Sequence, residues 1–221
     1  MKAWHFLQSS GKLRDETEPP PDGVWLEYPG IRRICESGLH ASIKPMDALR
    51  YAPGNIVCRV EVDTFQMITR DDKINVCRRK ILWRYNASEV LRHFACLCAL
   101  DVIDKWDAPE IVRKYLRTRD PELRAEAGDA AWNVVCDDWP SLSDSDRKAA
   151  KASAREAARE AARDAAWESS YYSAVAASGA ASGAASGAAS WASVGAWAAA
   201  TEAVMTVQNK RLNRMLTEGR P

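Results

Sequence analysis

Ile56-Val57-Cys58-Arg59-Val60-Glu61-Val62 is the stretch that decides the fold of the N-terminal part of this chain. Apolar and charged side chains alternate toward its end, which is typical of a β-strand with one buried face. Pro53-Gly54-Asn55 precedes it, and such a run of turn formers marks the point where a chain changes direction. We therefore expect a strand that begins directly after this turn.

The sequence on both sides of this strand predicts more strands and one short helix. Turn formers at 19–23 and 71–73 separate these segments. We expect strands at 3–7 and 24–28, a helix at 43–51, and one or two strands within 74–85 that carry basic residues on their outer face.

Helical patterns dominate after Asn86. Apolar residues recur every three or four positions, and Asn86 or Ser88 is a suitable cap for the first helix. We expect helices from this cap through Ile103, at 110–117, and from Pro121 through Val135. The fold class is therefore α+β, with a small N-terminal mixed sheet unit followed by an all-helical, Ala-rich C-terminal region. The predicted parts are an α+β head at 1–85, a helical region at 86–142, and a long Ala/Ser/Gly-rich helix at 143–221.

A four-residue repeat begins at Lys151, with quartets such as REAA and GAAS. Four residues advance a helix by about 400°, so small residues four apart form a slowly winding ridge that lets two helices approach closely. A lone helix of this composition buries little apolar area, and each internal glycine costs about 1 kcal/mol relative to alanine. We expect self-association through residues of this ridge, namely Gly179, Gly183, Gly187, Trp191 and Trp197. Packing on the helices of 87–136 and a low-complexity tail are the alternatives.

Composition excludes some classes of protein. The 221 residues contain 31 Lys and Arg against 30 Asp and Glu, which argues against nucleic acid as a partner. The uncharged run from Ser169 to Thr201 consists mostly of Ala, Ser and Gly, which argues against a membrane span. The six cysteines lack zinc-ribbon spacing, and Met1 leads into no signal peptide. We therefore expect reduced core cysteines in a cytosolic protein, with no metal and no cofactor.

The stretch from Cys35 to Ser42 is the most distinctive segment outside the repeat. His40 follows Gly38 at an expected turn, and loops of this kind often carry function. Cys35 as a nucleophile with His40 as its base lacks a recognisable oxyanion element. A zinc site from Cys35, His40 and Cys58 lacks a fourth ligand at a diagnostic spacing.

A small anionic ligand is better matched by the residue types around His40. Arginines pair with phosphate oxygens, and aromatic rings stack on bases. The predicted ligand-binding residues are His40, Ser42, Arg50, Tyr51, Arg59, Arg78, Arg79, Arg84, Trp25 and Trp83.

Two resemblances add context. The segments 2–7, 35–42, 47–54 and 71–73, together with the Ala/Trp-rich quartets, make the chain look like an uncharacterised domain family carried by bacteriophages and prophages. This resemblance implies a protein made in the cytoplasm of a bacterial host, and no activity. Residues 1–62 are similar to ADP-ribosyltransferase-like folds, chiefly in the stretch 38–62. This similarity implies that His5 matches a first-motif histidine, that His40 stands where an aromatic residue is usual, and that Glu61 is the acidic residue.

Three functions therefore remain open from the sequence. The first is an oligomeric phage protein, not an enzyme, that sequesters a nucleotide-type ligand such as a host immune signal. The second is an ADP-ribosyltransferase-like enzyme that uses NAD with His5, His40 and Glu61. The third is a structural phage protein, or one that binds a host protein through the repeat.

Overall fold

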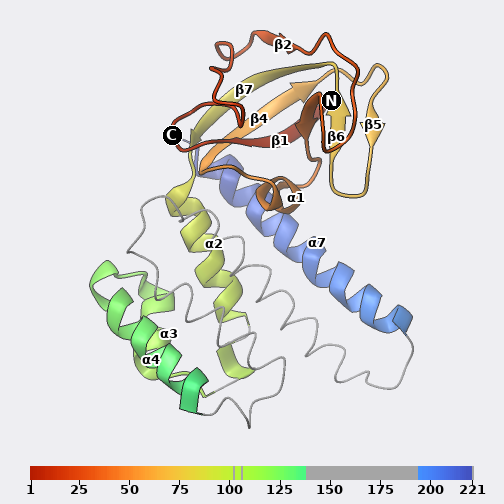
Figure 1. Cartoon of the computed structure of the whole chain (residues 1–221). Coiled ribbons are helices and arrows are strands. Elements are labelled where there is room, and N and C mark those ends of the chain that lie inside the picture. Colours follow the sequence, from red (N-terminus) through yellow and green to blue (C-terminus); the bar gives the residue numbers. More distant parts are fainter. Residues whose placement is uncertain (102, 106, 138–193, 221) are drawn as a thin grey trace. The chain divides into compact units, whose positions relative to one another are not determined.

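The fold is described from a computed structural model, which describes residues 1–101, 103–105, 107–137 and 194–220 (Figure 1). It is a mixed α+β fold that divides into two compact units. The first unit comprises Met1–Glu89 and Leu212–Pro221, and the second comprises Val90–Arg211. The predicted repeat residues Gly179, Gly183, Gly187 and Trp191 lie outside the described residues, as does the side chain of Trp197.

Seven short strands and one helix make up most of the first unit. They are β1 (Lys2–Leu7), β2 (Trp25–Glu27), β3 (Leu39–Ala41), α1 (Pro45–Arg50), β4 (Ile56–Val62), β5 (Ile68–Thr69), β6 (Ile74–Val76) and β7 (Arg78–Asn86). The predictions for β1, β2, α1 and β4 are confirmed, and the stretch 74–85 contains two strands. The expectation that His40 lies in a turn is wrong, because His40 is the central residue of β3.

The strands form two antiparallel sheets, ordered β1-β4-β7-β2 and β3-β6-β5. Two features join them. Cys77 alone separates β6 from β7, and the backbones of Trp4 and Ser42 exchange hydrogen bonds of 2.8 and 3.0 Å. The strands therefore wrap around a single core in the manner of a partly closed barrel.

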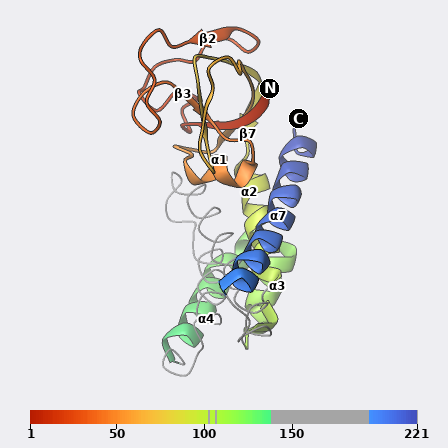
Figure 2. The ribbon, with the colours of Figure 1, turned by 90° about the vertical axis from the view of Figure 1, so that its right-hand side faces the viewer.

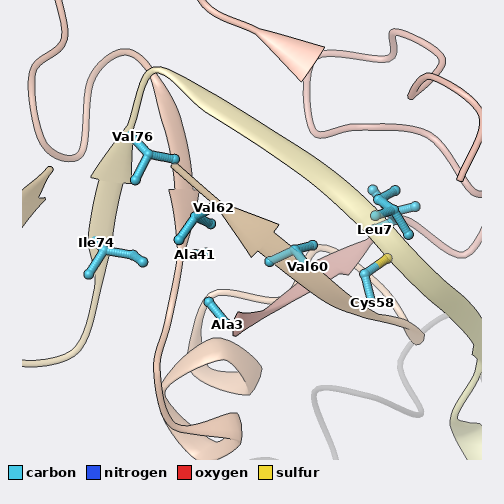
Figure 3. Packing of buried hydrophobic residues seen from close by; sticks show 9 residues of the cluster. Ala3, Leu7, Ala41, Cys58, Val60, Val62, Ile74 and Val76 are labelled. Atoms are coloured by element: carbon cyan, nitrogen blue, oxygen red, sulfur yellow. The ribbon is translucent and has the colours of Figure 1, made fainter. Parts of the chain in front are cut away.

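The core of this barrel is formed by the inward side chains of five strands, as Figure 3 shows. The alternation of apolar and charged residues in 56–62 accounts for the contribution of β4 to this core, because Cys58, Val60 and Val62 all face inward. The full set is Ala3, Leu7, Ala41, Cys58, Val60, Val62, Ile74, Val76 and Ile81.

Helices make up the second unit. The elements are α2 (Ser88–Leu100), η1 (Ile103–Lys105), α3 (Glu110–Thr118), η2 (Pro121–Leu123), α4 (Arg124–Asp137) and α7 (Val194–Glu218). The first two residues of α2 and the last residues of α7, from Leu212, belong to the first unit. The Oδ1 atom of Asn86 accepts from the N–H of Ser88 at 3.0 Å, as expected of a cap. Within this unit α7 lies beside α2, because Cys98 of α2 donates to Oε1 of Gln208 in α7 at 3.0 Å (Figure 2). No helix among the described residues is both long and apolar enough to cross a membrane.

Candidate functional site

The side chain of His40 is placed by the pairing of β3 with β6. Leu39 and Ala41 pack on the barrel core, so His40 between them projects from the other face of the strand. Its strand partner is Asn75, which is completely buried. His40 itself is half-buried.

One ring nitrogen of His40 is already occupied. Its Nε2 atom accepts from the backbone N–H of Cys35 at 3.2 Å and lies 3.2 Å from Nδ2 of Asn75. The neutral ring therefore carries its proton on Nδ1. Because the lone pair of Nε2 faces backbone and amide donors, His40 is not placed as a base for the Cys35 thiol, although the sequence left that role open.

Cys35 is exposed and has a φ of 71°, in the left-handed region. Its Sγ atom accepts a hydrogen bond from Nζ of Lys73 at 3.3 Å. The same ammonium lies 3.7 Å from the centroid of the Tyr51 ring. Burial opposes the charge of Lys73, but hydrogen bonds to Tyr51 and Cys35 outweigh it and raise the pKa of Lys73 above its ordinary value.

Tyr51 connects this lysine to two more charged groups. Its hydroxyl donates to the carboxylate of Asp72, which also pairs with Arg50 at 3.6 Å. Its backbone oxygen accepts from Nη2 of Arg14 at 2.7 Å. The ion pair of Arg50 is formed with Asp72, whereas Arg14 and Lys73 have no carboxylate within 4 Å among the residues that the structure describes.

Arg79 is the most deeply placed cation of this region. Only 4% of it is exposed, because it lies with Ile81 on the inner face of β7. Its Nη1 atom donates to the backbone oxygen of His40. Burial lowers the pKa of Arg79 to about 10, so it remains a cation at neutral pH. No described carboxylate lies within ion-pair distance of it.

The positive charges of these cations help to lower the pKa values of two histidines, His40 and His5. Burial lowers the pKa of His40, and the charges of Lys73, Arg79 and Arg14 lower it further. Burial also lowers the pKa of His5 well below its ordinary value, and Arg79 adds to this effect. We call the group of Arg14, Cys35, His40, Tyr51, Lys73, Asn75 and Arg79 the His40 cluster.

Several predicted ligand-binding residues lie elsewhere and have partners. Arg78 pairs with Glu27 at 2.9 Å, and Arg84 pairs with Asp22 at 3.2 Å. The guanidinium of Arg78 and the ammonium of Lys80 also lie 5.0 and 4.7 Å from the ring centroid of Trp25. These side chains neutralise or cover one another, so they do not add to the His40 cluster.

Arg59 and Trp83 lie on the outer face of the first sheet, away from the core. The guanidinium of Arg59 is 4.5 Å from the ring of Trp4, which meets Trp83 edge to face at 5.8 Å. The Nη1 atom of Arg59 is buried without a hydrogen-bond partner among the described residues. Ser42, also predicted as a ligand residue, is 2% exposed and contributes backbone hydrogen bonds to β1.

Glu61 of the transferase-like alternative and Cys58 of the zinc alternative lie away from the side chain of His40. Glu61 pairs with Lys80 at 2.8 Å, on the opposite face of β4 from the inward side chains that neighbour His5. Cys58 faces the core, where burial raises its pKa to about 12 and keeps it a neutral thiol. The described residues contain no cluster of side chains suited to a metal ion.

Sequence reasoning overlooked Arg14, Lys73 and Asn75 as members of the site. The sequence indicated Lys73 only as part of the turn at 71–73. Asn75 stood out only as one polar residue in an apolar strand. The segment from Cys35 to Ser42 did carry the right signal, because it supplies both His40 and Cys35. The interpretation of all cysteines as core residues is wrong for Cys35.

One comparison with known proteins gives a match that covers most of this site. A domain of unknown function, DUF7666, matches residues 17–93. This range contains every member of the His40 cluster except Arg14. No curated protein and no solved structure matches the chain.

Proposed function

We propose that this protein binds a small anionic ligand of the nucleotide type at the His40 cluster. The observation that carries the proposal is the gathering of three cations, Arg14, Lys73 and Arg79, around His40 with no carboxylate in ion-pair distance among the described residues. Surface cations usually find water or an acidic neighbour, and Arg78 and Arg84 of this chain do pair with acids.

A phosphate group suits this arrangement for physical reasons. Its oxygens accept charge-assisted hydrogen bonds, which are about twice as strong as neutral ones. Arginine presents a rigid fork of donors and lysine a compact point charge, so the cluster offers both kinds of contact. Tyr51, which is partly exposed, provides an aromatic surface at the edge of the cluster.

Binding without turnover is the simpler role for these residues. His40 has one nitrogen engaged by the backbone of Cys35, and Glu61 is held by Lys80 on another face. Sequestration requires affinity and copy number, and it requires no general acid or base. We further propose that the protein is phage-encoded, acts in the cytoplasm of the bacterial host, and associates with itself through the four-residue repeat.

Two measurements test the binding proposal. The purified protein is first heated, and the small molecules released are identified by mass spectrometry. Calorimetric titration then compares adenosine, adenosine monophosphate and NAD. We expect the monophosphate to bind more tightly than the nucleoside, because only the monophosphate carries the anionic group. NAD is included because an enzyme of the ADP-ribosyltransferase type would consume it.

Matched variants locate the site. Lys73→Gln and Arg14→Gln each remove one cation of the cluster, and each is expected to weaken binding of the monophosphate about tenfold. Lys114→Gln is the control, since Lys114 is an exposed lysine of α3. Equal affinity for nucleoside and monophosphate, or equal loss in the control, would refute the proposal.

Self-association has its own test. Sedimentation of the full chain is expected to show a multimer, and Gly183→Leu is expected to shift it toward single subunits by obstructing the ridge. A single subunit in the unaltered protein would contradict this part.

A further inference from the structure

The ring of His40 holds both ends of the turn that precedes β3. Its Nε2 atom accepts from the backbone N–H of Cys35 at 3.2 Å, and the ring also donates a hydrogen bond to the backbone oxygen of Gly38. Because Nε2 is an acceptor, Nδ1 is the donor of the second bond. We call residues 33–38 the Cys35 loop. The form of the ring that closes this loop is therefore the neutral imidazole with its proton on Nδ1.

The side-chain amide of Asn75 requires the same form of the ring. Its Nδ2 atom donates to the backbone oxygen of Ser37 at 2.7 Å and lies 3.2 Å from Nε2 of His40. The reversed amide would place Oδ1 against the oxygen of Ser37, so the backbone fixes the orientation of the amide. Asn75 is completely buried and is the strand partner of His40. The Nε2 atom therefore faces two hydrogen-bond donors.

Protonation of His40 turns this acceptor into a donor. The new N–H on Nε2 would face the N–H of Cys35 and the amide of Asn75, and two donors cannot pair. Rotation of the ring does not restore the bond, because both nitrogens of an imidazolium carry protons. The bond between Asn75 and Ser37 is unaffected, so the end of the loop that contains Cys35 is the part released.

The backbone of Cys35 favours this release. Its φ of 71° lies in the left-handed region, which is unfavourable for a residue with a Cβ atom. Arg33 and Ser37 exchange backbone hydrogen bonds of 3.2 and 2.8 Å at the base of the Cys35 loop, and these bonds do not involve Cys35. The bond to His40 therefore holds a strained residue in place.

The charges that face His40 from the neighbouring elements are positive. Burial has the largest effect in lowering the pKa of His40, and Lys73 before β6, Arg79 of β7 and Arg14 of the loop after β1 lower it further. His5 of β1 also lies near His40, and burial above all keeps its pKa well below the ordinary value, so it is neutral at neutral pH.

Two carboxylates of the neighbouring segments are engaged elsewhere. Asp72 pairs with Arg50 at 3.6 Å and accepts from the hydroxyl of Tyr51. Glu36 pairs with Arg33 at 3.5 Å. No acidic residue is among the groups of the described chain whose charges act on the ring of His40. An anion bound among the three cations would supply the negative charge that a protonated ring lacks.

We propose that His40 is a proton-sensitive latch, whose neutral ring holds Cys35 and whose protonated ring releases it. The consequence for ligands rests on the proposed function, because an anion in the His40 cluster stabilises the protonated ring. Release also frees Nζ of Lys73 from its contact of 3.3 Å with the sulfur of Cys35. Anion binding is therefore expected to strengthen as the pH falls, and bound anion is expected to favour protonation of His40, as reciprocal linkage requires.

Nuclear magnetic resonance of the full chain tests the latch without a ligand. The ring nitrogens of His40 report its tautomer and protonation, and the backbone amide of Cys35 reports the loop. At neutral pH we expect the proton on Nδ1. As the pH falls, the ring is expected to protonate below its ordinary value of 6.5, and the Cys35 amide to shift with the same midpoint. Hydrogen exchange of this amide, relative to the unfolded chain at each pH, should quicken about tenfold.

Matched variants assign the effect to this ring. His40→Gln offers an oxygen that accepts a hydrogen bond but takes up no proton in this range, so the Cys35 amide is expected to lose its dependence on pH. His93→Gln is the control, because His93 belongs to α2 in the second unit, and it is expected to leave the midpoint unchanged. The titration of the unaltered chain decides the matter if His40→Gln fails to fold.

Sulfate is the probe for the link to the proposed site, because it remains a dianion throughout the titration. We expect sulfate to raise the midpoint of His40 above that in sodium chloride of equal ionic strength. Its affinity is expected to be about fivefold higher for the protonated form than for the neutral form.

The failures of the two proposals are distinguishable. The latch is overturned by a ring that protonates while the Cys35 amide stays unchanged, by a neutral ring with its proton on Nε2, or by a ring that stays neutral throughout. A Cys35 amide that follows the ring, with a midpoint that sulfate moves no more than chloride does, would support the latch and remove the anion from the His40 cluster.

Discussion

The guanidinium of Arg79 donates a hydrogen bond to the backbone oxygen of His40, so a buried cation of β7 meets an unpaired carbonyl of β3. The backbone of Ser42, which directly follows β3, bonds to Trp4 of β1. Alternate residues of a strand direct their backbone groups to the same edge, so the carbonyl of His40 also faces β1. The pairing of β1 with β3 ends at Ser42, and Arg79 supplies the missing donor.

Arg79→Met separates a structural role of this arginine from a ligand-binding role. The substitution removes one hydrogen bond, but it also removes a buried charge that has no described acidic partner, and these effects oppose each other. We expect the free energy of unfolding to change by less than about 2 kcal/mol, while the affinity for an anionic nucleotide falls about tenfold or more. Urea denaturation and calorimetric titration give the two values.

Arg84→Met is the control for this experiment. Arg84 is on the same strand and the same face but pairs with Asp22, so its loss is expected to leave nucleotide affinity unchanged. A large loss of stability in Arg79→Met with unchanged affinity in the folded fraction would assign Arg79 a purely structural role.

Gly38 permits the turn that presents Cys35 and His40. It has a φ of 101°, and a Cβ atom at this position would lie 2.3 Å from Oδ1 of Asn75. Gly38→Ala is therefore expected to destabilise the fold through both backbone strain and a steric clash. Gly11→Ala is the matched substitution, because Gly11 has a φ of 86° but no atom within 4 Å of the added Cβ.

The two alanine variants isolate the clash. Backbone strain is expected to cost each about 1–2 kcal/mol, and the contact with Asn75 to add a further 1–3 kcal/mol, about the cost of overpacking, in Gly38→Ala alone. The free energies of unfolding in urea give the difference. Equal costs would show that Asn75 moves aside freely and does not hold the turn.

The strands of the first unit could be predicted where alternation was long enough to be read. β4 has the bounds that its sequence indicates, because the inward residues Cys58, Val60 and Val62 are apolar and Glu61 is charged. β3 escaped prediction because it has three residues and follows a glycine. Its strand conformation is imposed by pairing with β6, a contact between segments far apart in sequence.

The orientation of the basic residues of β7 could not be read from the sequence, because a bulge changes the phase of the strand. Arg59 pairs with Trp83, whereas Val60 pairs with Ile81, so Leu82 is the extra residue. A shift by one residue moves the following side chains to the other face. Arg78 and Lys80 project outward as predicted. Arg79, which lies between them, faces inward by simple alternation, and Arg84 follows the inner face because it lies beyond the bulge.

Three of the predicted ligand-binding residues lie in the His40 cluster, and ligand binding there stays a prediction. They are His40, Tyr51 and Arg79, which is attached to the backbone of His40. Lys73 and Asn75 enter through the pairing of β6 with β3, which places a turn residue and a buried amide beside a loop cysteine. No pattern within a single segment of the sequence predicts this contact between β6 and β3.

His5 gives the stability of the first unit a dependence on pH. Burial, the charge of Arg79 and smaller effects of His40 and Arg14 hold its pKa below the ordinary value of 6.5. In the unfolded chain the imidazole takes up a proton near that ordinary value, whereas folded His5 stays neutral. Its contribution to stability is therefore complete above the ordinary value and is lost as the pH falls below it, by up to about 1.4 kcal/mol per pH unit.

His5→Gln is expected to reduce the pH dependence of stability. The free energy of unfolding in urea, measured from about pH 7 to about pH 5, should fall less steeply in this variant than in the unaltered chain. His93→Gln is the control, because His93 is less enclosed in α2 and is expected to change the slope less. An unchanged slope in His5→Gln would show that His5 is protonated in the folded state.

Asp101 holds α7 within the second unit through a carboxylate shared by two side chains. It accepts from Arg211 at 2.6 and 3.2 Å and from Gln208 at 2.9 Å, and Gln208 is 2% exposed. An asparagine at position 101 keeps the size of the side chain but loses the charge and one acceptor. Asp101→Asn is therefore expected to lower the free energy of unfolding by about 1–3 kcal/mol, because a buried amide and a guanidinium are left with weakened partners.

Asp104→Asn is the matched control. Asp104 also pairs with an arginine, Arg113, at 2.8 Å, but its side chain is 86% exposed, and exposed pairs contribute about 1 kcal/mol or less. Thermal unfolding and amide hydrogen exchange along α7 compare the two variants. If both cost the same, or if exchange along α7 is unchanged in Asp101→Asn, then the apolar residues of α7 hold it in place and the polar contacts with Asp101 add nothing measurable.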